Sequence, residues 1–331
     1  MNIMKYIAAL LATMLLAIAS GEENPLKDFN NDILIKSFFR DNGQHGVYLA
    51  ASDDGIVFTP LNDDKPVMVP APWEKQNLTR DPSIIFHEGA FHLVWTTGWR
   101  GDCFGYAKSM DLIHWSEPVR VQPFKGRQNP KNVWAPEICW DPYQKEFMII
   151  WSSEIAPAGQ RIFVTRTKDG ENFSEAELFH ERDYNVIDGH LLLDVPGKRW
   201  LLTYKNENST KDGGKNIRIA ATSEDFSKPF VDLLDEAIVG SGTAIQGENG
   251  EKSMGEGPSL VKMNDTYHIY WDSPFLKYYC LATSKDLKIW KDRTKELKVP
   301  SGMRHGTAFR APRAAVGWLK IVSSTTPAPG K

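Results

Sequence analysis

Short apolar segments separated by polar turns run through most of the chain. The clearest segments are rich in aromatic and β-branched residues, which favour β-strands; they span 90–95, 145–151, 199–204 and 266–271. Polar turns such as 87–89 and 195–198 separate them from the strand before. After the first 20 residues no amphipathic helical run of useful length stands out. The sequence therefore predicts an all-β fold.

A small polar signature recurs five times along the chain. It consists of Ser or Thr, one further residue, and Asp, with an aromatic residue four or five positions beyond the Asp. The five Asp residues are Asp54, Asp111, Asp169, Asp225 and Asp286, at steps of 57, 58, 56 and 61 residues. Steps of this size fit four strands with their turns, which is one blade of a propeller. We expect each signature to form the turn that closes an outer hairpin of its blade.

The order of the segments indicates how the ring closes. Two strand-like segments, 34–39 and 46–50, precede the first signature, and the last strand opening, 304–309, has no signature after it. We therefore expect N- and C-terminal strands to share the fifth blade, which removes the free sheet edges. The predicted architecture is a five-bladed β-propeller whose last blade is closed by the N- and C-terminal strands.

The N-terminus has the form of a cleavable secretory signal over residues 1–20. Lys5 is followed by an apolar run from 7 to 18 and then by small residues. The run is short for a membrane span, and no Cys follows it to carry a lipid; the alternative is a buried N-terminal helix. We expect an exported protein, periplasmic or secreted, with one catalytic domain over 21–331 and a disordered tail from about 323.

Composition excludes some classes of function. The formal net charge of −3 gives no electrostatic reason to expect nucleic acid or a membrane surface as a partner. The three cysteines, Cys103, Cys139 and Cys280, are odd in number and widely spaced, which argues against a disulfide framework or a zinc site. The eleven Trp residues fit sugar binding on aromatic faces, although most are expected in the core. We expect a monomer.

The starts of the innermost strands carry the candidate chemistry. In a propeller these strands run side by side around the axis, so their starts meet at one mouth. The residues at five equivalent places there are Asp81, Glu137, Asp188, Glu256 and His305. Crowded carboxylates raise one another's pKa, and a proton donor beside a carboxylate base is what glycosidic bond cleavage requires. Singly, Asp-Pro and Asp-Gly are ordinary turn dipeptides; their repetition favours a site.

The motifs at these openings are Arg80-Asp81-Pro82-Ser83, Trp134-Ala135-Pro136-Glu137, Val186-Ile187-Asp188, Glu256-Gly257-Pro258 and Arg304-His305-Gly306-Thr307. In order and spacing, over nearly all of the mature chain, they resemble glycoside hydrolase family 43. Members of that family are five-bladed propellers with a catalytic base, a general acid and an Asp that tunes the acid. The chain looks most similar to the arabinofuranosidase-like branch from polysaccharide-degrading gut bacteria.

The resemblance implies a role for each matching residue. Asp81 matches the general base that activates water, Glu256 the general acid, and Asp188 the residue that tunes the pKa of the acid. His305 matches an axial His that in relatives holds a water or a structural Ca²⁺ in the central channel; no cofactor is required for the chemistry. Glu137 departs from the Asp that is more usual in its motif, which leaves substrate binding or strand anchoring open.

Other residues near the openings are candidates for substrate contact. Trp99, Trp134 and Trp140 could form a sugar platform or pack between blades, and Arg304 or Arg310 could reach the site beside His305.

The implied function is exo-acting, inverting hydrolysis that removes terminal α-L-arabinofuranosyl residues from plant-type polysaccharide or oligosaccharide. β-Xylosidase or exo-β-galactosidase activity within the same family remains open, as does a non-catalytic propeller that binds carbohydrate or protein. The Arg80-Asp81-Pro82 motif also resembles that of retaining, invertase-like fructosidases. Their upstream Asn-Asp-Pro-Asn and their Glu-Cys motif are absent from the sequence, which disfavours that reading.

Overall fold

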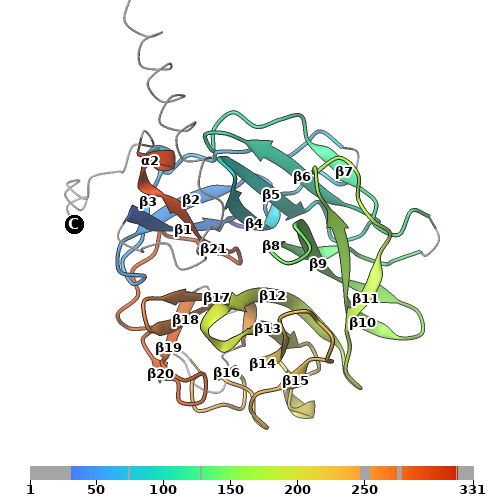
Figure 1. Cartoon of the computed structure of the whole chain (residues 1–331), viewed down its shortest axis with the longest axis vertical. Helices are drawn as coiled ribbons and strands as arrows, with labels where there is room; N and C mark the ends of the chain where they lie inside the picture. Colours follow the sequence, from blue (N-terminus) through green and yellow to red (C-terminus); the bar gives the residue numbers. More distant parts are fainter. Residues whose placement is uncertain are drawn as a thin grey trace, which may run out of the picture. The chain divides into compact units, whose positions relative to one another are not determined.

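Five antiparallel β-sheets surround a common axis in the computed structural model (Figure 1). The structure describes residues 31–73, 75–126, 129–246, 254–273, 278–317 and 319. The predicted signal peptide and the predicted disordered tail lie outside these residues. Within them, the sheets confirm the predicted all-β, five-bladed propeller.

Four blades are each formed by one continuous stretch of chain. Blade 1 contains β4 (Arg80–His87), β5 (Ala90–Thr96), β6 (Phe104–Ser109) and β7 (Val119–Val121). Blade 2 contains β8 (Trp134–Asp141), β9 (Glu146–Ile155), β10 (Gly159–Thr167) and β11 (Glu177–His180). Blade 3 contains β12 (Val186–Asp194), β13 (Arg199–Asn206), β14 (Asn216–Ser223) and β15 (Val231–Asp232), with β16 (Val239–Gly240) paired to β14. Blade 4 contains β17 (Glu256–Met263), β18 (Thr266–Ser273), β19 (Tyr278–Ser284) and β20 (Lys291–Asp292).

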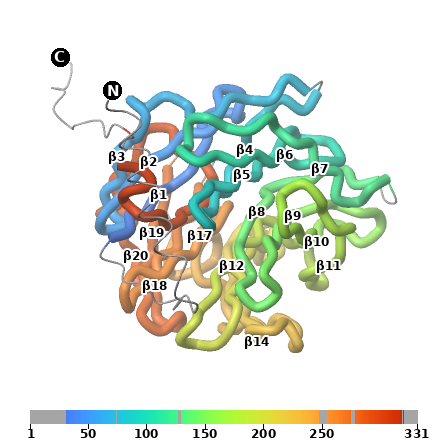
Figure 2. Tube along the Cα trace, turned by 45° about the horizontal axis from the view of Figure 1, so that its top comes forward, coloured from blue at the N-terminus to red at the C-terminus, as the bar shows by residue number. Residues whose placement is uncertain are grey.

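Blade 5 joins the two ends of the propeller. Its spatial order is β21 (Ala308–Pro312), β1 (Asp32–Phe38), β2 (Tyr48–Ser52) and β3 (Thr59–Pro60). In the β1–β21 ladder Ile35 lies opposite Phe309. The predicted closure by N- and C-terminal strands is therefore confirmed. The inner strands β4, β8, β12, β17 and β21 contact one another in turn around the axis (Figures 1 and 2).

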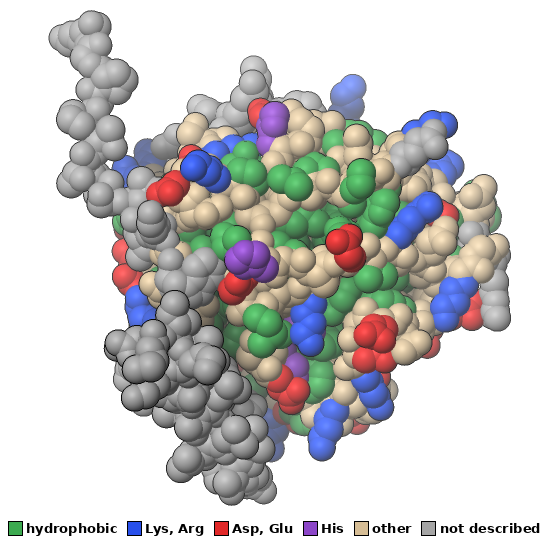
Figure 3. Space-filling model, turned by 90° about the horizontal axis from the view of Figure 1, so that it is seen from above, with side chains coloured by type: hydrophobic (Ala, Val, Ile, Leu, Met, Phe, Trp, Pro, Cys, Tyr) green, Lys and Arg blue, Asp and Glu red, His purple; other side chains and the backbone are tan. Residues whose placement is uncertain are grey.

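Helical structure in the described residues is confined to single turns. These are η3 (Asn62–Asp64), η4 (Val195–Gly197), η5 (Thr210–Asp212) and α2 (Arg313–Val316). Among the residues that the structure describes, no helix is long and apolar enough to cross a membrane. On the face shown in Figure 3, acidic and basic side chains are interspersed, as expected for a small net charge.

The hydrophobic core is divided into five clusters, each between two neighbouring blades. The largest fully buried side chains are four tryptophans, one on the second strand of each of blades 1 to 4: Trp95, Trp151, Trp200 and Trp271. The space between two diverging sheets is wedge-shaped, and large aromatic side chains fill it. Each such side chain buries about 150–250 Å² of surface. The blades are thus joined by apolar packing, which leaves polar groups available at the axis.

The five polar signatures lie where the sequence predicts them, directly after the third strand of each blade. In blade 1, Asp111 Oδ1 accepts hydrogen bonds from the amides of Ile113 (3.0 Å) and His114 (2.8 Å). Asp54, Asp169 and Asp286 accept the same pair of bonds in their turns, and Asp225 accepts the first of the two. The carboxylate supplies acceptors for turn amides that the sheet cannot satisfy.

The seam between blade 5 and blade 1 depends on a buried hydroxyl. Ser37 Oγ donates to the Pro82 carbonyl (2.6 Å) and accepts from the Thr307 amide (3.2 Å). We expect Ser37→Ala to lower the free energy of unfolding by about 1 kcal/mol, because buried polar groups lose a partner. Urea denaturation measures this difference. Ser227→Ala, in the outer turn of blade 3, is the matched control; an equal loss in both variants would contradict a special role for the seam.

Candidate active site

Each of the four inner strands β4, β8, β12 and β17 carries a β-bulge near its start, where the register of the ladder shifts. A bulge bends a strand and re-aims its side chains. One residue at the same point of each bulge has a left-handed backbone, with φ of 49° at Asp81, 47° at Ala135, 54° at Asp188 and 57° at Gly257. Residues other than Gly adopt this conformation only against a steric penalty. The surrounding structure therefore holds it in place.

Three of the openings are held from the preceding blade. A polar residue near the end of that blade's second strand lies opposite the bulge of its own blade and accepts a hydrogen bond from the next opening. The three bonds to backbone amides are Ala135 N to Thr96 Oγ1 (2.7 Å), Asp188 N to Ser152 Oγ (2.9 Å) and His305 N to Asp272 Oδ2 (3.2 Å). The position and orientation of these three openings thus depend on the preceding blade.

The bulges place the predicted residues at three different positions. Asp81 and Asp188 occupy the left-handed position, and Glu256 lies one residue before it in its own strand. Glu137 lies two residues after the left-handed position, where blade 1 has Ser83. The prediction of five equivalent places was therefore wrong; among the carboxylates only Asp81 and Asp188 are equivalent.

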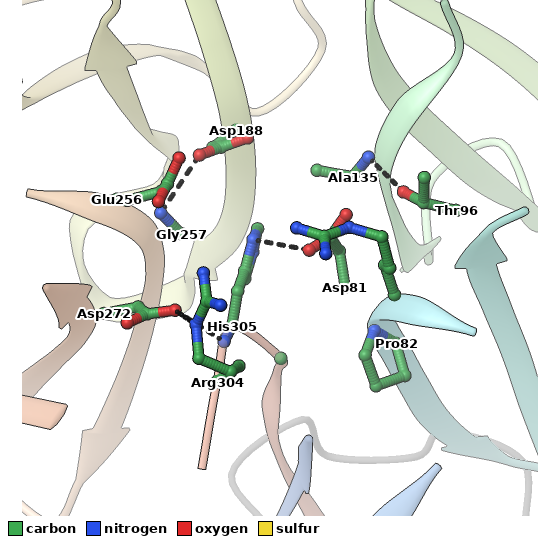
Figure 4. Close-up of polar contacts among 12 residues, drawn as sticks. Asp81, Pro82, Thr96, Ala135, Asp188, Glu256, Gly257, Asp272, Arg304 and His305 are labelled. Atoms are coloured by element: carbon green, nitrogen blue, oxygen red, sulfur yellow. Dashed lines mark hydrogen bonds and ion pairs between the residues drawn. The ribbon is translucent and has the colours of Figure 1, made fainter. Parts of the chain in front are cut away.

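Asp81, Asp188, Glu256 and His305 nevertheless line one cavity of about 300 Å³ (Figure 4). The other lining residues are Arg80, Trp99, Trp134, Ile187, Lys205, Glu207, Lys215, Met254 and Arg304. Residues from blades 1 to 5 therefore meet at one opening of the propeller. Of the predicted contact residues, Trp99, Trp134 and Arg304 belong to this lining.

Asp81 and His305 form a buried pair on one side of the cavity. His305 Nδ1 lies 3.4 Å from Asp81 Oδ1. Burial alone lowers the pKa of His305, but the hydrogen bond to Asp81 and the negative charge of Asp81 outweigh burial and raise the pKa to about 9. Burial raises the pKa of Asp81, but His305 and Arg80 reverse the effect and lower it to about 2. Asp81 is thus a carboxylate at neutral pH.

Gly257 gives the ring of His305 its place. A Cβ built on Gly257 would lie 2.2 Å from His305 Cγ, and the residue has a left-handed φ of 57°. Both the close approach and the backbone conformation require glycine here.

Asp188 and Glu256 form the opposite side of the cavity. Asp188 Oδ2 accepts a hydrogen bond from the Gly257 amide (3.1 Å), and Glu256 Oε1 accepts one from Lys205 Nζ (2.9 Å). Burial, together with the charges of Glu256 and Asp81, raises the pKa of Asp188 to about 6 against the opposing charges of His305 and Lys205. Burial would raise the pKa of Glu256 too, but the charge and hydrogen bond of Lys205 lower it. Of the pair, Asp188 is therefore the group that takes up a proton first as the pH falls.

Besides Glu207 and Lys215 in the cavity lining, three residues at or next to the site were not found from the sequence. Lys205 contacts Glu256, and Asp272 binds Arg304 (Nε–Oδ2 2.6 Å). Lys36, buried in β1, donates to the Gly306 carbonyl (2.7 Å). The sequence pattern that could have pointed to them is a charged residue inside an apolar strand. The clearest case is Trp271-Asp272, which corresponds to Trp95-Thr96 in blade 1.

Glu137 does not line the cavity. Its carboxylate accepts hydrogen bonds from Ser83 Oγ (2.6 Å) and Thr307 Oγ1 (2.7 Å) and lies 3.5 Å from His190 Nδ1. Burial raises its pKa, but the charge of His190 and the two hydroxyl bonds outweigh burial and lower it. Glu137 connects its own strand β8 to β4, to β12 and to the residue before β21, so the structure places it as a strand anchor outside the cavity lining.

Two further candidates also lie away from the cavity lining. Arg310 lies on β21 with its guanidinium 3.4 Å from Asp32 Oδ2, on the partner strand β1. Trp140, in the second half of β8, stacks on His87 with ring centroids 3.8 Å apart. The predicted substrate contact by Arg310 was therefore wrong, and Trp140 is a packing residue.

His305 does not fit the predicted role as a metal ligand. With its pKa raised to about 9, the imidazole carries a proton on both nitrogens at neutral pH and has no free lone pair. Among the described residues, no group of three or more His, Cys, Asp or Glu side chains could hold a metal ion.

Comparisons with known proteins bear on this geometry. A family model described as "Probable glycosyl hydrolase domain", related to glycoside hydrolase family 43, matches residues 32–314. A thermostable family-43 glycoside hydrolase of known structure superposes with a TM-score of 0.54 at 17% identity, covering 69% of this chain and 78% of that one. The catalytic domain of the GH62 α-L-arabinofuranosidase of Coprinopsis cinerea gives 0.52 at 12% identity, covering 74% and 77%.

The GH43B protein of the Bacteroides ovatus xyloglucan locus superposes with a TM-score of 0.52 at 16% identity, covering 69% of this chain and 42% of that one. This chain thus spans less than half the length of that relative. At these identities the structural similarities show the fold alone. No curated protein sequence matches the chain.

A substitution at Glu137 separates anchoring from substrate binding. We expect Glu137→Ala to lower the free energy of unfolding by about 2–4 kcal/mol, because buried hydroxyls and His190 lose their partner. Glu137→Gln, which keeps an acceptor oxygen, should lose much less. Thermal and urea unfolding measure both variants. A large rise in KM with unchanged stability would contradict the anchoring role.

Proposed function

Since the chain belongs to the glycosyl hydrolase family related to glycoside hydrolase family 43, we propose that it is an exo-acting, inverting glycosidase. Its proposed substrates are plant-type polysaccharides or oligosaccharides that end in α-L-arabinofuranosyl residues. The observation that carries the proposal is the meeting of Asp81, Asp188 and Glu256, from three different blades, in one cavity. Among these carboxyl groups the pKa of Asp81 is lowered and that of Asp188 is raised, so the cavity combines a carboxylate with a group that takes up a proton more readily. Export through an N-terminal signal is part of the proposal.

Asp81 is the proposed base. Its low pKa keeps it ionised, so it can accept a proton from water that attacks the anomeric carbon. His305 fixes the orientation of the carboxylate through the 3.4 Å contact. The bulge that gives Asp81 its left-handed backbone directs the side chain into the cavity.

Glu256 is the proposed acid, and Asp188 modulates it. As the pH falls, the pair takes up its first proton on Asp188, because burial and the charges of Glu256 and Asp81 disfavour the ionised form of Asp188. In the proposed step this proton passes to Glu256 and from it to the departing glycosidic oxygen, while water adds to the anomeric carbon from the opposite side and loses its proton to Asp81. One C–O bond breaks, one forms, and the anomeric configuration is inverted.

The cavity wall supports recognition of a single terminal sugar. Its volume of about 300 Å³ lies at the small end of ligand pockets. Trp99, whose residue surface is 52% exposed, meets Trp134 edge to face with centroids 6.1 Å apart. Arg80 stacks over the Trp99 ring at 4.2 Å, and Asn42 accepts a hydrogen bond from the Trp99 indole (2.9 Å). A fixed aromatic surface of this kind suits a sugar face.

β-Xylosidase and exo-β-galactosidase activities are the rivals within the family, and a non-catalytic carbohydrate-binding propeller is the rival outside it. Nitrophenyl arabinofuranoside, xyloside and galactoside separate the proposed activity from the two rivals within the family by which substrate releases nitrophenol. Sugar binding without release from any of them would favour the non-catalytic alternative.

Removal of the acid tests the assignment directly. We expect Glu256→Ala to lower kcat on a natural oligosaccharide by about 100- to 10,000-fold, because general acid catalysis contributes that much. The loss should be smaller on nitrophenyl glycosides, whose leaving group needs no proton. Glu296→Ala, at an exposed Glu paired with Arg293, is the control. Near-normal turnover of the oligosaccharide by Glu256→Ala would rule out the assignment.

Stereochemistry and pH give a second test. Proton NMR of the first-formed sugar should show the anomer opposite to that of the substrate, and net retention would exclude a single displacement.

Because Asp188 has a pKa of about 6 in the free protein, kcat/KM should fall as the pH rises through about 6. No acid limb is expected near pH 4, since Asp81 stays ionised there.

A further inference from the structure

Four side chains of alternating charge form a continuous row along the cavity wall. Lys215 Nζ lies 2.5 Å from Glu207 Oε1, Glu207 Oε2 lies 2.7 Å from Lys205 Nζ, and Lys205 Nζ lies 2.9 Å from Glu256 Oε1. All four residues line the cavity. Lys205 thus has two carboxylate partners, one at the proposed acid and one away from it.

The row belongs to blade 3 and ends on blade 4. Lys205 lies on β13, and Glu207 and Lys215 lie at the two ends of the loop that joins β13 to β14. The Lys205 side chain is only 2% exposed, while those of Glu207 and Glu256 are 28% and 27% exposed. Charge interactions at such a site are stronger than on the surface, because little water screens them.

The fold itself does not call for a lysine at position 205. The corresponding residues of other blades are Thr96, Ser152 and Asp272, which accept a hydrogen bond from the next opening. Lys205 cannot accept, and the Gly257 amide is bound instead by Asp188 (3.1 Å). Blade 3 therefore departs from the common arrangement at the point where the proposed acid lies.

We propose that the row Lys215–Glu207–Lys205–Glu256 sets the pH range in which the catalytic acid holds its proton. This inference rests on the proposed function of Glu256. The ammonium group of Lys205 pairs with Glu207 as well as with Glu256. Because of this second pairing, Lys205 stabilises the Glu256 carboxylate less. Lys215 in turn neutralises part of the Glu207 charge. Lys205, Glu207 and Lys215 are positioning residues that act through Glu256.

Other charged groups also face Glu256. Arg304 and His305 precede β21, Asp188 lies on β12 and Asp272 on β18. Glu207 and Lys215 can be changed while the side chains of these four residues are retained. The two substitutions should therefore report on the row itself.

The expected shifts have opposite signs. Glu207→Gln removes a negative charge, so the ammonium group of Lys205 interacts more strongly with Glu256. The acid should therefore lose its proton at lower pH, and the alkaline limb of kcat/KM should shift to lower pH. Lys215→Met removes a positive charge, so the Glu207 carboxylate interacts more strongly with the ammonium group of Lys205. The acid should then keep its proton to higher pH, and the limb should move up.

The experiment measures kcat/KM against pH on an oligosaccharide substrate for wild type and both variants. Exposed charges serve as matched controls: Glu296→Gln, which removes the partner of Arg293, and Lys285→Met, which removes the partner of Asp265. Opposite shifts in the two row variants, with unmoved controls, support the proposal. Unmoved limbs, or shifts of the same sign, overturn it even if kcat falls, because loss of structure alone does not reverse the sign.

A second readout is independent of turnover. In protein labelled with ¹³C at Glu side-chain carboxyls, the Glu256 signal is identified by its absence from Glu256→Gln, and its titration is followed in each variant. Wild type that cleaves no glycoside would refute the proposed function, while the titration still tests the row. Wild type that turns over with an unmoved titration in both variants would refute the row alone.

Discussion

The bond from each blade to the opening of the next is the constraint on which the axis of this protein depends. Four of the five inner strands start with a bulge, three of them with a non-glycine residue in the left-handed conformation, and a side chain from the preceding blade holds three of the openings through a buried amide. Ser37 makes the corresponding link from blade 5 to blade 1. Because the links run around a closed ring, hydrogen bonds position each opening relative to its neighbours.

This arrangement explains how a small cavity tolerates so many buried charges. Asp81 is compensated by His305, Glu256 by Lys205, and Arg304 by Asp272. A buried charge without a partner would be destabilising by several kcal/mol, so each charge brings its partner from a neighbouring blade. Asp188 lacks such a cation in direct contact, and burial together with the charges of Glu256 and Asp81 raises its pKa to about 6.

Much of this followed from the sequence because it repeats locally. The spacing of the signature Asp residues predicted five blades, and the absence of a signature after 304–309 predicted the closure. Glu137 was misplaced because the openings were aligned on their carboxylates; aligned on Pro82, Pro136, Gly189 and Pro258, they put Asp81 beside Ala135 and Glu137 beside Ser83. Lys205 escaped notice because its partner is set by the register between β12 and β13 and by a contact across blades, neither of which repeats in the sequence.

The closing blade has a consequence for how the protein becomes functional. Its innermost strand, β21, follows every other strand in the chain, and the turn before it carries Arg304 and His305. Blades 1 to 4 precede residue 305 in the chain, so Asp81 has no imidazole partner in any segment that ends before that residue. Asp81 and His305 are separated by 224 residues in the sequence. The turn that completes the site thus immediately precedes the last described strand, so a chain that ends before residue 304 lacks both residues.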